Sequence, residues 1–213
     1  KFDAHIVCAP YTSEIIKSIL KDDGIKIKNE IKPVNINSRY KVSDNIEIEF
    51  IHITHSIPQS ALVAIHTKYG VIVYANDFKL DLHPTLGKKP DFKRMKELSK
   101  ENVIALVVES TYSSDQRKMP SEQVAKEMLR DVLLGTDNND NLIVVTTFSS
   151  HMARLKSIIE FGKKLNRKII FLGRSLAKYV KSAENVGIVN FSKDVEIVKY
   201  SKQIERKLRK VDK

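Results

Sequence analysis

The feature of this sequence that most limits its fold is a series of apolar runs that each end near one ionisable side chain. Four runs are followed within a few residues by His55, Asp77, Glu109 and His151. Short apolar runs bounded by turn residues predict strands. Open α/β sheets place their functional groups at the carboxyl ends of strands. The pattern therefore predicts an α/β fold with candidate site residues at one edge of a sheet.

The spacing of the runs predicts a first, β-rich part. A helix is expected after Pro10, ending before Gly24. Three further runs predict a β-meander, in which Lys68-Tyr69-Gly70 forms a hairpin turn. The predicted strands of this part are residues 5–9, 46–53, 61–66 and 71–75.

From residue 103 onward the pattern alternates between strands and helices. This alternation favours a small parallel sheet flanked by helices. The boundary between the two parts is expected in the polar stretch at residues 113–120. The predicted strands are 103–108, 142–146 and 168–172, and the predicted helices are 122–134, 151–165, 175–184 and 202–213.

The charge balance of the chain is strongly basic. The 37 Lys and Arg residues outnumber 26 Asp and Glu, giving a formal net charge of +11. Such an excess attracts polyanions, chiefly nucleic acid, in a salt-dependent manner. A lysine-rich solvated surface, as in proteins of heat-loving organisms, explains the charge equally well.

Cysteine content and hydropathy indicate where such a chain works. Cys8 is the single cysteine and lies in an apolar run, so we expect a small buried side chain, no disulfide and a reducing, cytoplasmic location. No apolar run approaches the roughly 18 residues of a membrane helix, and no signal peptide is visible. The sequence opens without Met and in mid-pattern, so we expect a piece of a longer protein.

His55 and Asp77 are the candidate metal ligands. Imidazole and carboxylate are the ligands that hydrolytic zinc uses, and zinc supplies hydroxide near neutral pH. The alternatives are a turn or core histidine and an aspartate that caps the next turn. Asn76 is expected in the left-handed conformation, and Asp81 is expected to be solvated.

Glu109 and His151 are the catalytic candidates. Glu109 would orient a metal-bound histidine or accept a proton, and its alternative role is a capping carboxylate. His151 opens a helix after Ser149 and Ser150, where hydroxyls and free N–H groups suit a phosphate. The alternative is that a serine is only an N-cap and His151 only a first-turn residue.

Gly173-Arg174-Ser175 repeats the arrangement of strand, tight turn and helix, so Arg174 is a third phosphate-binding candidate besides Ser149 and Ser150. The tripeptide alone is a weak signal. Taken together, two metal-type ligands at strand ends and two phosphate-type helix starts in a basic chain favour phosphodiester hydrolysis.

Five strings of this sequence, in this order, resemble ribonuclease J. They are Thr54-His55-Ser56-Ile57-Pro58, Asn76-Asp77-Phe78-Lys79-Leu80-Asp81, Glu109-Ser110-Thr111, Thr146-Thr147-Phe148-Ser149-Ser150-His151 and Gly173-Arg174-Ser175. The resemblance is to the archaeal type and covers nearly the whole chain. It implies part of a metallo-β-lactamase αββα sandwich at 1–115 and a β-CASP domain portion at 116–213.

The resemblance also implies roles for residues. His55 would ligate one zinc, and Asp77 would bridge two zincs. Glu109 would support a metal-bound histidine. His151 would support the scissile phosphate, and Ser149, Ser150 and Arg174 would hold the RNA backbone. The implied activity is zinc-dependent hydrolysis of RNA, in the 5′-to-3′ direction, in RNA processing and decay, by a homodimer or larger homo-oligomer.

The sequence departs from the family by lacking its His-x-His-x-Asp-His string, whose place would be before Lys1, and its final histidine motif, whose place would be after Lys213. One His and one Asp are too few ligands for two zincs at roughly four each. We therefore expect a catalytic parent protein and an inactive isolated stretch. The alternatives are an endoribonuclease of the polyadenylation-factor type and a non-catalytic RNA- or nucleotide-binding module.

Overall fold

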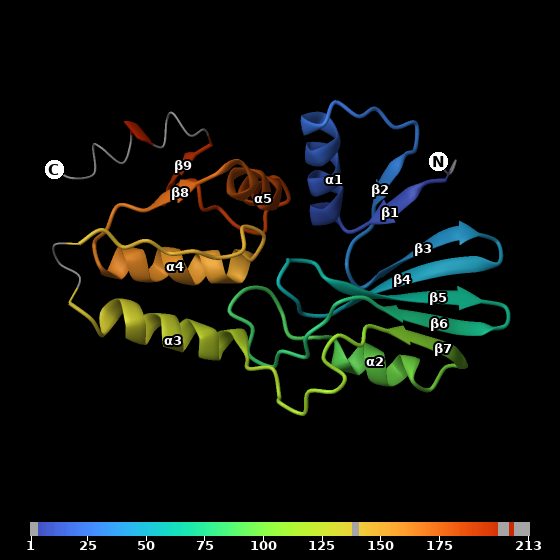
Figure 1. Cartoon of the computed structure of the whole chain (residues 1–213). Helices are drawn as coiled ribbons and strands as arrows, with labels where there is room; N and C mark the ends of the chain where they lie inside the picture. The colour runs from blue at the N-terminus through green and yellow to red at the C-terminus, as the bar shows by residue number, and fades with distance from the viewer. Residues whose placement is uncertain (1–3, 138–140, 200–204, 207–213) are drawn as a thin grey trace. The chain divides into compact units, whose positions relative to one another are not determined.

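The structure is a computed structural model that describes residues 4–137, 141–199 and 205–206. The chain is mixed α/β and divides into two compact units, Lys1–Ser121 and Glu122–Lys213 (Figure 1). The division falls close to the polar stretch at 113–120 where the boundary was expected. Most of the predicted helix at 202–213 lies outside the described residues. No described helix is long and apolar enough to cross a membrane.

The first unit is built around a five-stranded sheet in the order β3-β4-β5-β6-β7 (Figure 1). Strands β4 to β6 form the predicted antiparallel meander, and β5 and β6 meet in the hairpin at Lys68-Tyr69. Strand β3, which was not predicted, pairs with β4 in antiparallel. The bounds are Ser38–Ser43 for β3, Ile46–His52 for β4, Ala61–Thr67 for β5, Gly70–Ala75 for β6 and Val103–Val108 for β7.

Strand β7 pairs with β6 in parallel, so the first unit is not only a meander. The crossover between the two strands contains a short helix, α2 (Phe92–Leu98), which the sequence pattern did not reveal. The Asp91 side chain caps this helix by accepting a hydrogen bond from the Arg94 amide at 2.9 Å. Strand β7 lies at the edge of the sheet, and all six of its residues are exposed.

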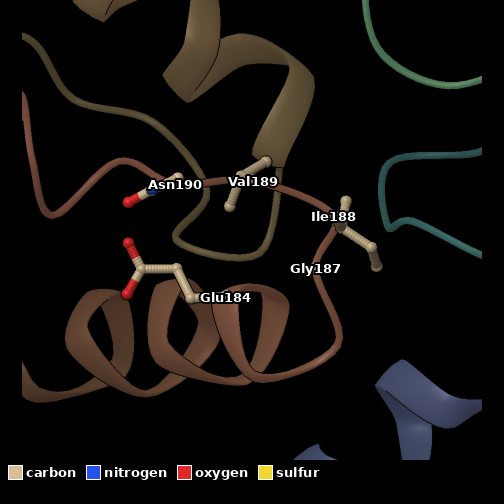
Figure 2. A pocket seen from close by; sticks show the side chains of 5 residues that line it. All are labelled: Glu184, Gly187, Ile188, Val189 and Asn190. Carbon is tan, nitrogen blue, oxygen red and sulfur yellow. The ribbon is translucent and has the colours of Figure 1, made fainter.

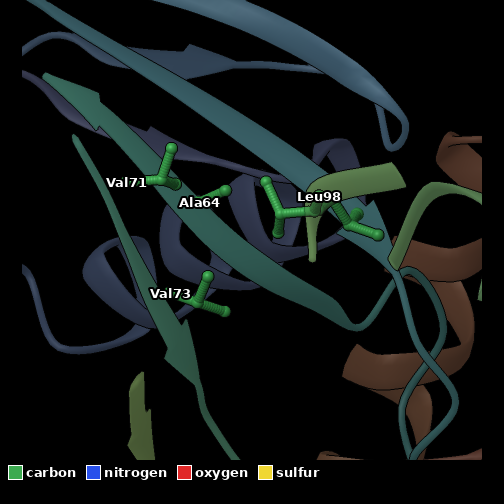
Figure 3. Close-up of a cluster of buried hydrophobic side chains, with 5 residues drawn as sticks. Ala64, Val71, Val73 and Leu98 are labelled. Atoms are coloured by element: carbon green, nitrogen blue, oxygen red, sulfur yellow. The ribbon is translucent and has the colours of Figure 1, made fainter. Parts of the chain in front are cut away.

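Helix α2 covers one face of the sheet. The buried side chains Ile51, Ala64, Val71 and Val73 project from that face and pack with Leu98 of α2 (Figure 3). Glu49 lies on the same face, because its register partner Ala64 belongs to this cluster. A carboxylate is thus buried beside the core and needs polar partners.

A second sheet of the first unit pairs β1 (Ile6–Cys8) with β2 (Ile31–Pro33) in parallel. Between them lies α1 (Pro10–Asp22), the helix predicted after Pro10. Proline suits the first helical position, since it has no N–H to satisfy. Cys8 is buried, as expected for a small apolar side chain.

The second unit contains α3 (Glu122–Leu134), α4 (Met152–Lys164), and a parallel pair of strands, β8 (Ile170–Leu172) and β9 (Glu196–Val198), joined through α5 (Arg174–Asn185). The three predicted helices and the predicted strand at 168–172 are confirmed. Strand β9 was not predicted.

The strand predicted at residues 142–146 is wrong. These residues form no strand, and Leu142, Val144 and Val145 are exposed. An apolar run becomes a strand only when a neighbouring strand satisfies its backbone groups. In the described part of the second unit, β8 and β9 form a sheet of two strands that does not include this run.

Candidate functional site

The strand directions of the first unit bring three candidate residues to one edge of the five-stranded sheet. Strands β4, β6 and β7 run in the same direction, because β5 is antiparallel to both β4 and β6 while β7 is parallel to β6. Their carboxyl ends are followed by His55, Asp77 and Glu109, respectively. We call this set of three residues the sheet-edge site.

Asp77 and Glu109 follow neighbouring strand ends. Ala75 at the end of β6 is in register with Val108 at the end of β7. Glu109 directly follows the last residue of β7, and Asp77 comes two residues after Ala75. The parallel pairing therefore places the two acidic segments next to one another.

Thr54 ties the His55 segment to the Asp77 segment. Its carbonyl accepts a hydrogen bond from the Lys79 amide at 2.7 Å, and its hydroxyl donates to the Lys79 carbonyl. The same hydroxyl accepts from the Asp81 amide at 3.1 Å. Because Thr54 directly precedes His55, these bonds fix the loop that carries Asp77 beside the loop that carries His55.

The side chains of this edge differ in their contacts. His55 is exposed, and its Nδ1 lies 3.1 Å from the Ser56 hydroxyl oxygen. Glu109 accepts a hydrogen bond from the Thr111 amide at 2.8 Å, which is the capping arrangement given above as its alternative. That hydrogen bond is the main cause that lowers the pKa of Glu109, and the charge of His55 contributes in the same direction.

Two expectations about this edge are wrong. Asp81 is not solvated: it is 4% exposed, and its carboxylate accepts from the His83 amide at 2.9 Å. Asn76 is not left-handed; the described residues other than glycine with positive φ are Asn37, Gln59 and Asn166. The chain turns here through the hydrogen bonds of Thr54 and Asp81, so a left-handed residue is not required.

The fit of the sheet-edge site to zinc can be judged from its donors. Asp77 and His55 are exposed and chemically suitable. Among the described residues, however, no group of three or more His, Cys, Asp or Glu side chains is placed to hold a metal ion. The donors described here therefore do not make a zinc site by themselves.

In the second unit, His151 is itself the N-cap of α4. Its Nδ1 accepts a hydrogen bond from the Arg154 amide at 3.4 Å. This corrects the alternative in which a serine caps the helix and His151 belongs to the first turn. Ser149 and Ser150 are half-buried just before the cap, and the Ser150 carbonyl accepts from the Met152 amide at 3.0 Å.

His151 lies in a cluster that the sequence did not reveal. Glu122, the first residue of α3, is 6% exposed, and its Oε2 lies 3.5 Å from His151 Nε2. The Arg154 guanidinium donates to both oxygens of this carboxylate, at 2.6 Å and 3.0 Å. The hydrogen bond to Glu122 raises the pKa of Arg154. We call Glu122, His151 and Arg154 the His151 cluster.

Arg174 begins α5 directly after Gly173, the residue at the N-cap position, whose φ is 123°. Such a φ favours glycine, which has no Cβ to clash. Arg174 and Ser175 are both exposed, so both polar groups are accessible to solvent.

A hollow of about 600 Å³ lies elsewhere in this unit, beside the end of α5, lined by Glu184, Gly187, Ile188, Val189 and Asn190 (Figure 2). It contains none of the predicted site residues.

Comparison with known proteins shows which family this chain resembles. The family model described as "Ribonuclease J, beta-CASP domain" matches residues 140–210. A protein named "Ribonuclease J" from Methanocaldococcus jannaschii is 39% identical over 212 residues, which are 99% of this chain and 47% of that protein. Over nearly its whole length, this chain is therefore similar to part of ribonuclease J, and residues 140–210 match the β-CASP domain of that family. The resemblance given by the five strings is thus confirmed.

Two further ribonuclease J proteins extend the comparison. The one from Pyrococcus abyssi is 44% identical over 188 residues, covering 88% of this chain and 42% of that protein. "Ribonuclease J 2" from Staphylococcus epidermidis strain RP62A is 33% identical, covering 92% of this chain and 35% of that protein. The chain spans less than half of the length of these relatives.

One solved structure supports the fold alone. A crystal structure of a protein of unknown function from Enterococcus faecalis V583 superposes with a TM-score of 0.55 at 16% identity, covering 83% of this chain and 43% of that chain.

Proposed function

We propose that this chain is part of a ribonuclease that hydrolyses phosphodiester bonds of RNA. The observation that carries the proposal is the sheet-edge site, in which three strands of one direction end at the same edge and are followed by His55, Asp77 and Glu109. The similarity to known proteins supports it, because the relatives are named ribonuclease J. The net charge of +11 suits a polyanionic substrate.

The residues of this chain would divide the work as follows. His55 and Asp77 would be metal ligands, and Glu109 would fix the orientation of His55 through its negative charge. His151, Ser149, Ser150 and Arg174 would contact RNA phosphates. We propose zinc as the metal, with further ligands supplied by residues other than those described here. Bound zinc would supply hydroxide near neutral pH.

We further propose digestion from the 5′ end, in RNA processing and decay. The alternative within the same superfamily is an endoribonuclease of the polyadenylation-factor type. A preference for 5′-monophosphate RNA and release of single nucleotides support the first, whereas cleavage at defined internal sites supports the second.

A cytoplasmic location and a homodimer or larger assembly are also proposed; sedimentation of the purified protein measures the assembly.

The deciding experiment is Asp77→Ala in the longer protein of which this chain is part. We expect RNA cleavage to fall to background while salt-dependent RNA binding is retained, because a ligand is lost but the basic surface is not. Asp44→Ala is the matched control, since Asp44 is 93% exposed at the turn between β3 and β4, away from the carboxyl ends of the strands. Cleavage by the Asp77 variant at near-normal rates would exclude the proposed role. Binding without cleavage by the unmodified protein would favour the non-catalytic RNA-binding module.

A further inference from the structure

The loop between β4 and β5 carries one member of the sheet-edge site. A hydrogen bond from the Ile53 amide to the Ser60 carbonyl, at 3.1 Å, closes the loop and leaves residues 54–59 at its tip. His55 is the second of these residues, and its ring contacts Ser56, the next residue of the same loop. The position of the imidazole therefore depends on what holds the backbone of the loop.

Gln59 stands at the end of this loop in a backbone conformation that residues other than glycine rarely adopt. Its φ is 58°. This left-handed conformation is unfavourable for a residue with a Cβ, because the Cβ comes close to the following carbonyl oxygen. Such a conformation persists only where surrounding contacts impose it, and residues of this kind gather at functional sites. The contacts of Gln59 therefore bear on the shape of the whole loop.

The side chain of Gln59 fastens the loop to α1. Its Oε1 accepts a hydrogen bond from the Tyr11 amide at 2.8 Å, across 48 positions of the sequence. Tyr11 lies in the first turn of α1, where N–H groups have no acceptor within the helix. Ala9 occupies the N-cap position and has only a methyl group, so Gln59 supplies the oxygen that a capping side chain would otherwise provide. Tyr11 is buried, so loss of this acceptor would be costly.

The loop is thus fastened on both sides of His55. On the entering side, the hydrogen bonds of Thr54 join it to the loop that carries Asp77. On the leaving side, the hydrogen bond of Gln59 joins it to α1. A short segment that is held at one end only would keep much of its conformational freedom. Both anchors are therefore needed to fix the backbone between them.

We propose that Gln59 is a positioning residue for His55: by accepting from the Tyr11 amide, it holds the loop in the conformation that keeps the imidazole at the sheet-edge site. The inference rests on the proposed role of His55 in RNA cleavage. Without the Oε1 acceptor, the unfavourable backbone conformation at Gln59 can relax, and the loop moves with it. A displacement of about 1 Å at a reacting site can lower the rate by about 100-fold.

Kinetics of the longer protein test this role with Gln59→Met, which keeps the length of the side chain but removes the acceptor oxygen. We expect kcat for RNA cleavage to fall by about 10- to 100-fold. The change in KM should be much smaller, because the basic surface that attracts RNA is unaltered. Gln59→Glu is the conservative variant, since it keeps an acceptor oxygen and its negative charge suits the N-terminus of a helix. It should retain near-normal kcat.

A second substitution separates positioning of the loop from simple capping of α1. Ala9→Ser places a hydroxyl at the N-cap, where it can accept from the first-turn amides of α1 without help from the loop. Combined with Gln59→Met, it should restore thermal stability but not kcat, since the loop stays unfastened. Ala9→Ser alone is the control and should keep near-normal kcat. Recovery of kcat in the double variant would overturn the inference, because Gln59 would then act only as a cap.

Hydrogen exchange of the longer protein, measured by mass spectrometry, does not depend on activity. In Gln59→Met, the peptides that cover residues 54–60 and the start of α1 should both exchange faster, by about tenfold. In the double variant, α1 should regain protection while residues 54–60 still exchange fast. The double variant also serves if Gln59→Met alone does not fold. Unchanged protection of residues 54–60 in the folded variants would overturn the inference, whatever the activity.

The two proposals can fail separately. If His55→Ala cleaves RNA normally, the proposed role of His55 is wrong, and hydrogen exchange still decides whether Gln59 holds the loop. If His55→Ala is inactive but Gln59→Met retains full kcat, the positioning role is wrong and the proposed function stands.

Discussion

The Glu49 carboxylate accepts two hydrogen bonds from the Arg94 guanidinium, from Nε at 2.6 Å and from Nη2 at 2.9 Å. Glu49 lies in the sheet and Arg94 in α2, so the pair joins the two layers next to the apolar core of the first unit. His66 Nε2 lies 2.9 Å from the same carboxylate, and Arg39 lies 3.3 Å away. The bonds from Arg94 are the main cause that lowers the pKa of Glu49 from 4.5 to about 2.

This pair predicts a loss of stability in acid. A carboxyl group whose pKa is lower in the folded than in the unfolded protein stabilises the fold above the unfolded value, and the contribution is lost as the pH falls toward the folded value. The relevant window is therefore from about pH 4.5 down to about pH 2. The difference corresponds to roughly 3 kcal/mol of unfolding free energy.

Urea unfolding of Glu49→Gln at several pH values checks this prediction. The variant should be less stable than the unmodified protein by about 3 kcal/mol at pH 7, and the two should converge near pH 2. Glu47→Gln is the control, because Glu47 is more exposed and pairs with Arg39 at 3.0 Å. A constant difference between Glu49→Gln and the unmodified protein across the pH range would contradict the assignment.

Replacement of Thr54 by Val should loosen the loop that carries Asp77. The substitution keeps the shape of the side chain but removes the hydroxyl that bonds the Lys79 carbonyl and the Asp81 amide. Leaving such partners unsatisfied costs about 1–3 kcal/mol. Hydrogen exchange of the Asp81 amide should accelerate by about tenfold or more, whereas Thr54→Ser should restore protection. Equal protection in the Val variant would show that this hydroxyl does not hold the loop.

Gly70 should not tolerate a side chain. Its φ is +142°, and a Cβ there would lie 2.6 Å from both the Asn102 carbonyl oxygen and Ile104 Cγ2. Gly70→Ala should therefore lower the free energy of unfolding by about 2–3 kcal/mol. Gly24→Ala, with φ +66° and no atom within 4 Å of the added Cβ, should cost about 1 kcal/mol. Thermal unfolding of the two variants separates the steric contribution at Gly70 from the purely conformational one at Gly24. Equal melting temperatures of Gly70→Ala and Gly24→Ala would contradict the predicted steric clash at Gly70.

Binding of single-stranded RNA should weaken steeply with salt. If about three phosphates are neutralised, raising the salt concentration from 50 to 200 mM should lower the affinity by about 20-fold. Filter binding at several salt concentrations measures the slope. An affinity that does not respond to salt would assign the charge of +11 to a solvated surface instead.

The elements that could be predicted from the sequence are those whose pattern is local. The alternation in β4, the hairpin turn before Gly70 and the apolar spacing of α1 and α4 each depend on neighbouring residues. Helix α2 escaped prediction because it is short, and because the Asp91 that caps it reads equally well as a turn residue. The strand at 142–146 was wrongly predicted because pairing, unlike propensity, is not visible in the run itself.

The candidate site residues also fall into those that local sequence patterns predict and those that depend on tertiary packing. His55, Asp77, Glu109 and His151 stood out because each follows an apolar run or opens a helix. The partners of His151 could not be recognised in the sequence. Glu122 has the pattern of an ordinary acidic residue in the first turn of a helix, and Arg154 that of an ordinary surface cation. Their interaction joins residues 32 positions apart and depends on the packing of α3 against α4.

The direction of the strands leaves the opposite edge of the first sheet free of candidate site residues. The turn at Asp44-Asn45 lies at that edge, and the Asp44 side chain is 93% exposed. Burial raises the pKa of the Cys8 thiol, which disfavours the reactive thiolate. Asp44→Cys therefore offers a selective attachment point for a fluorophore, from which RNA binding could be followed optically without altering the chemistry at the other edge.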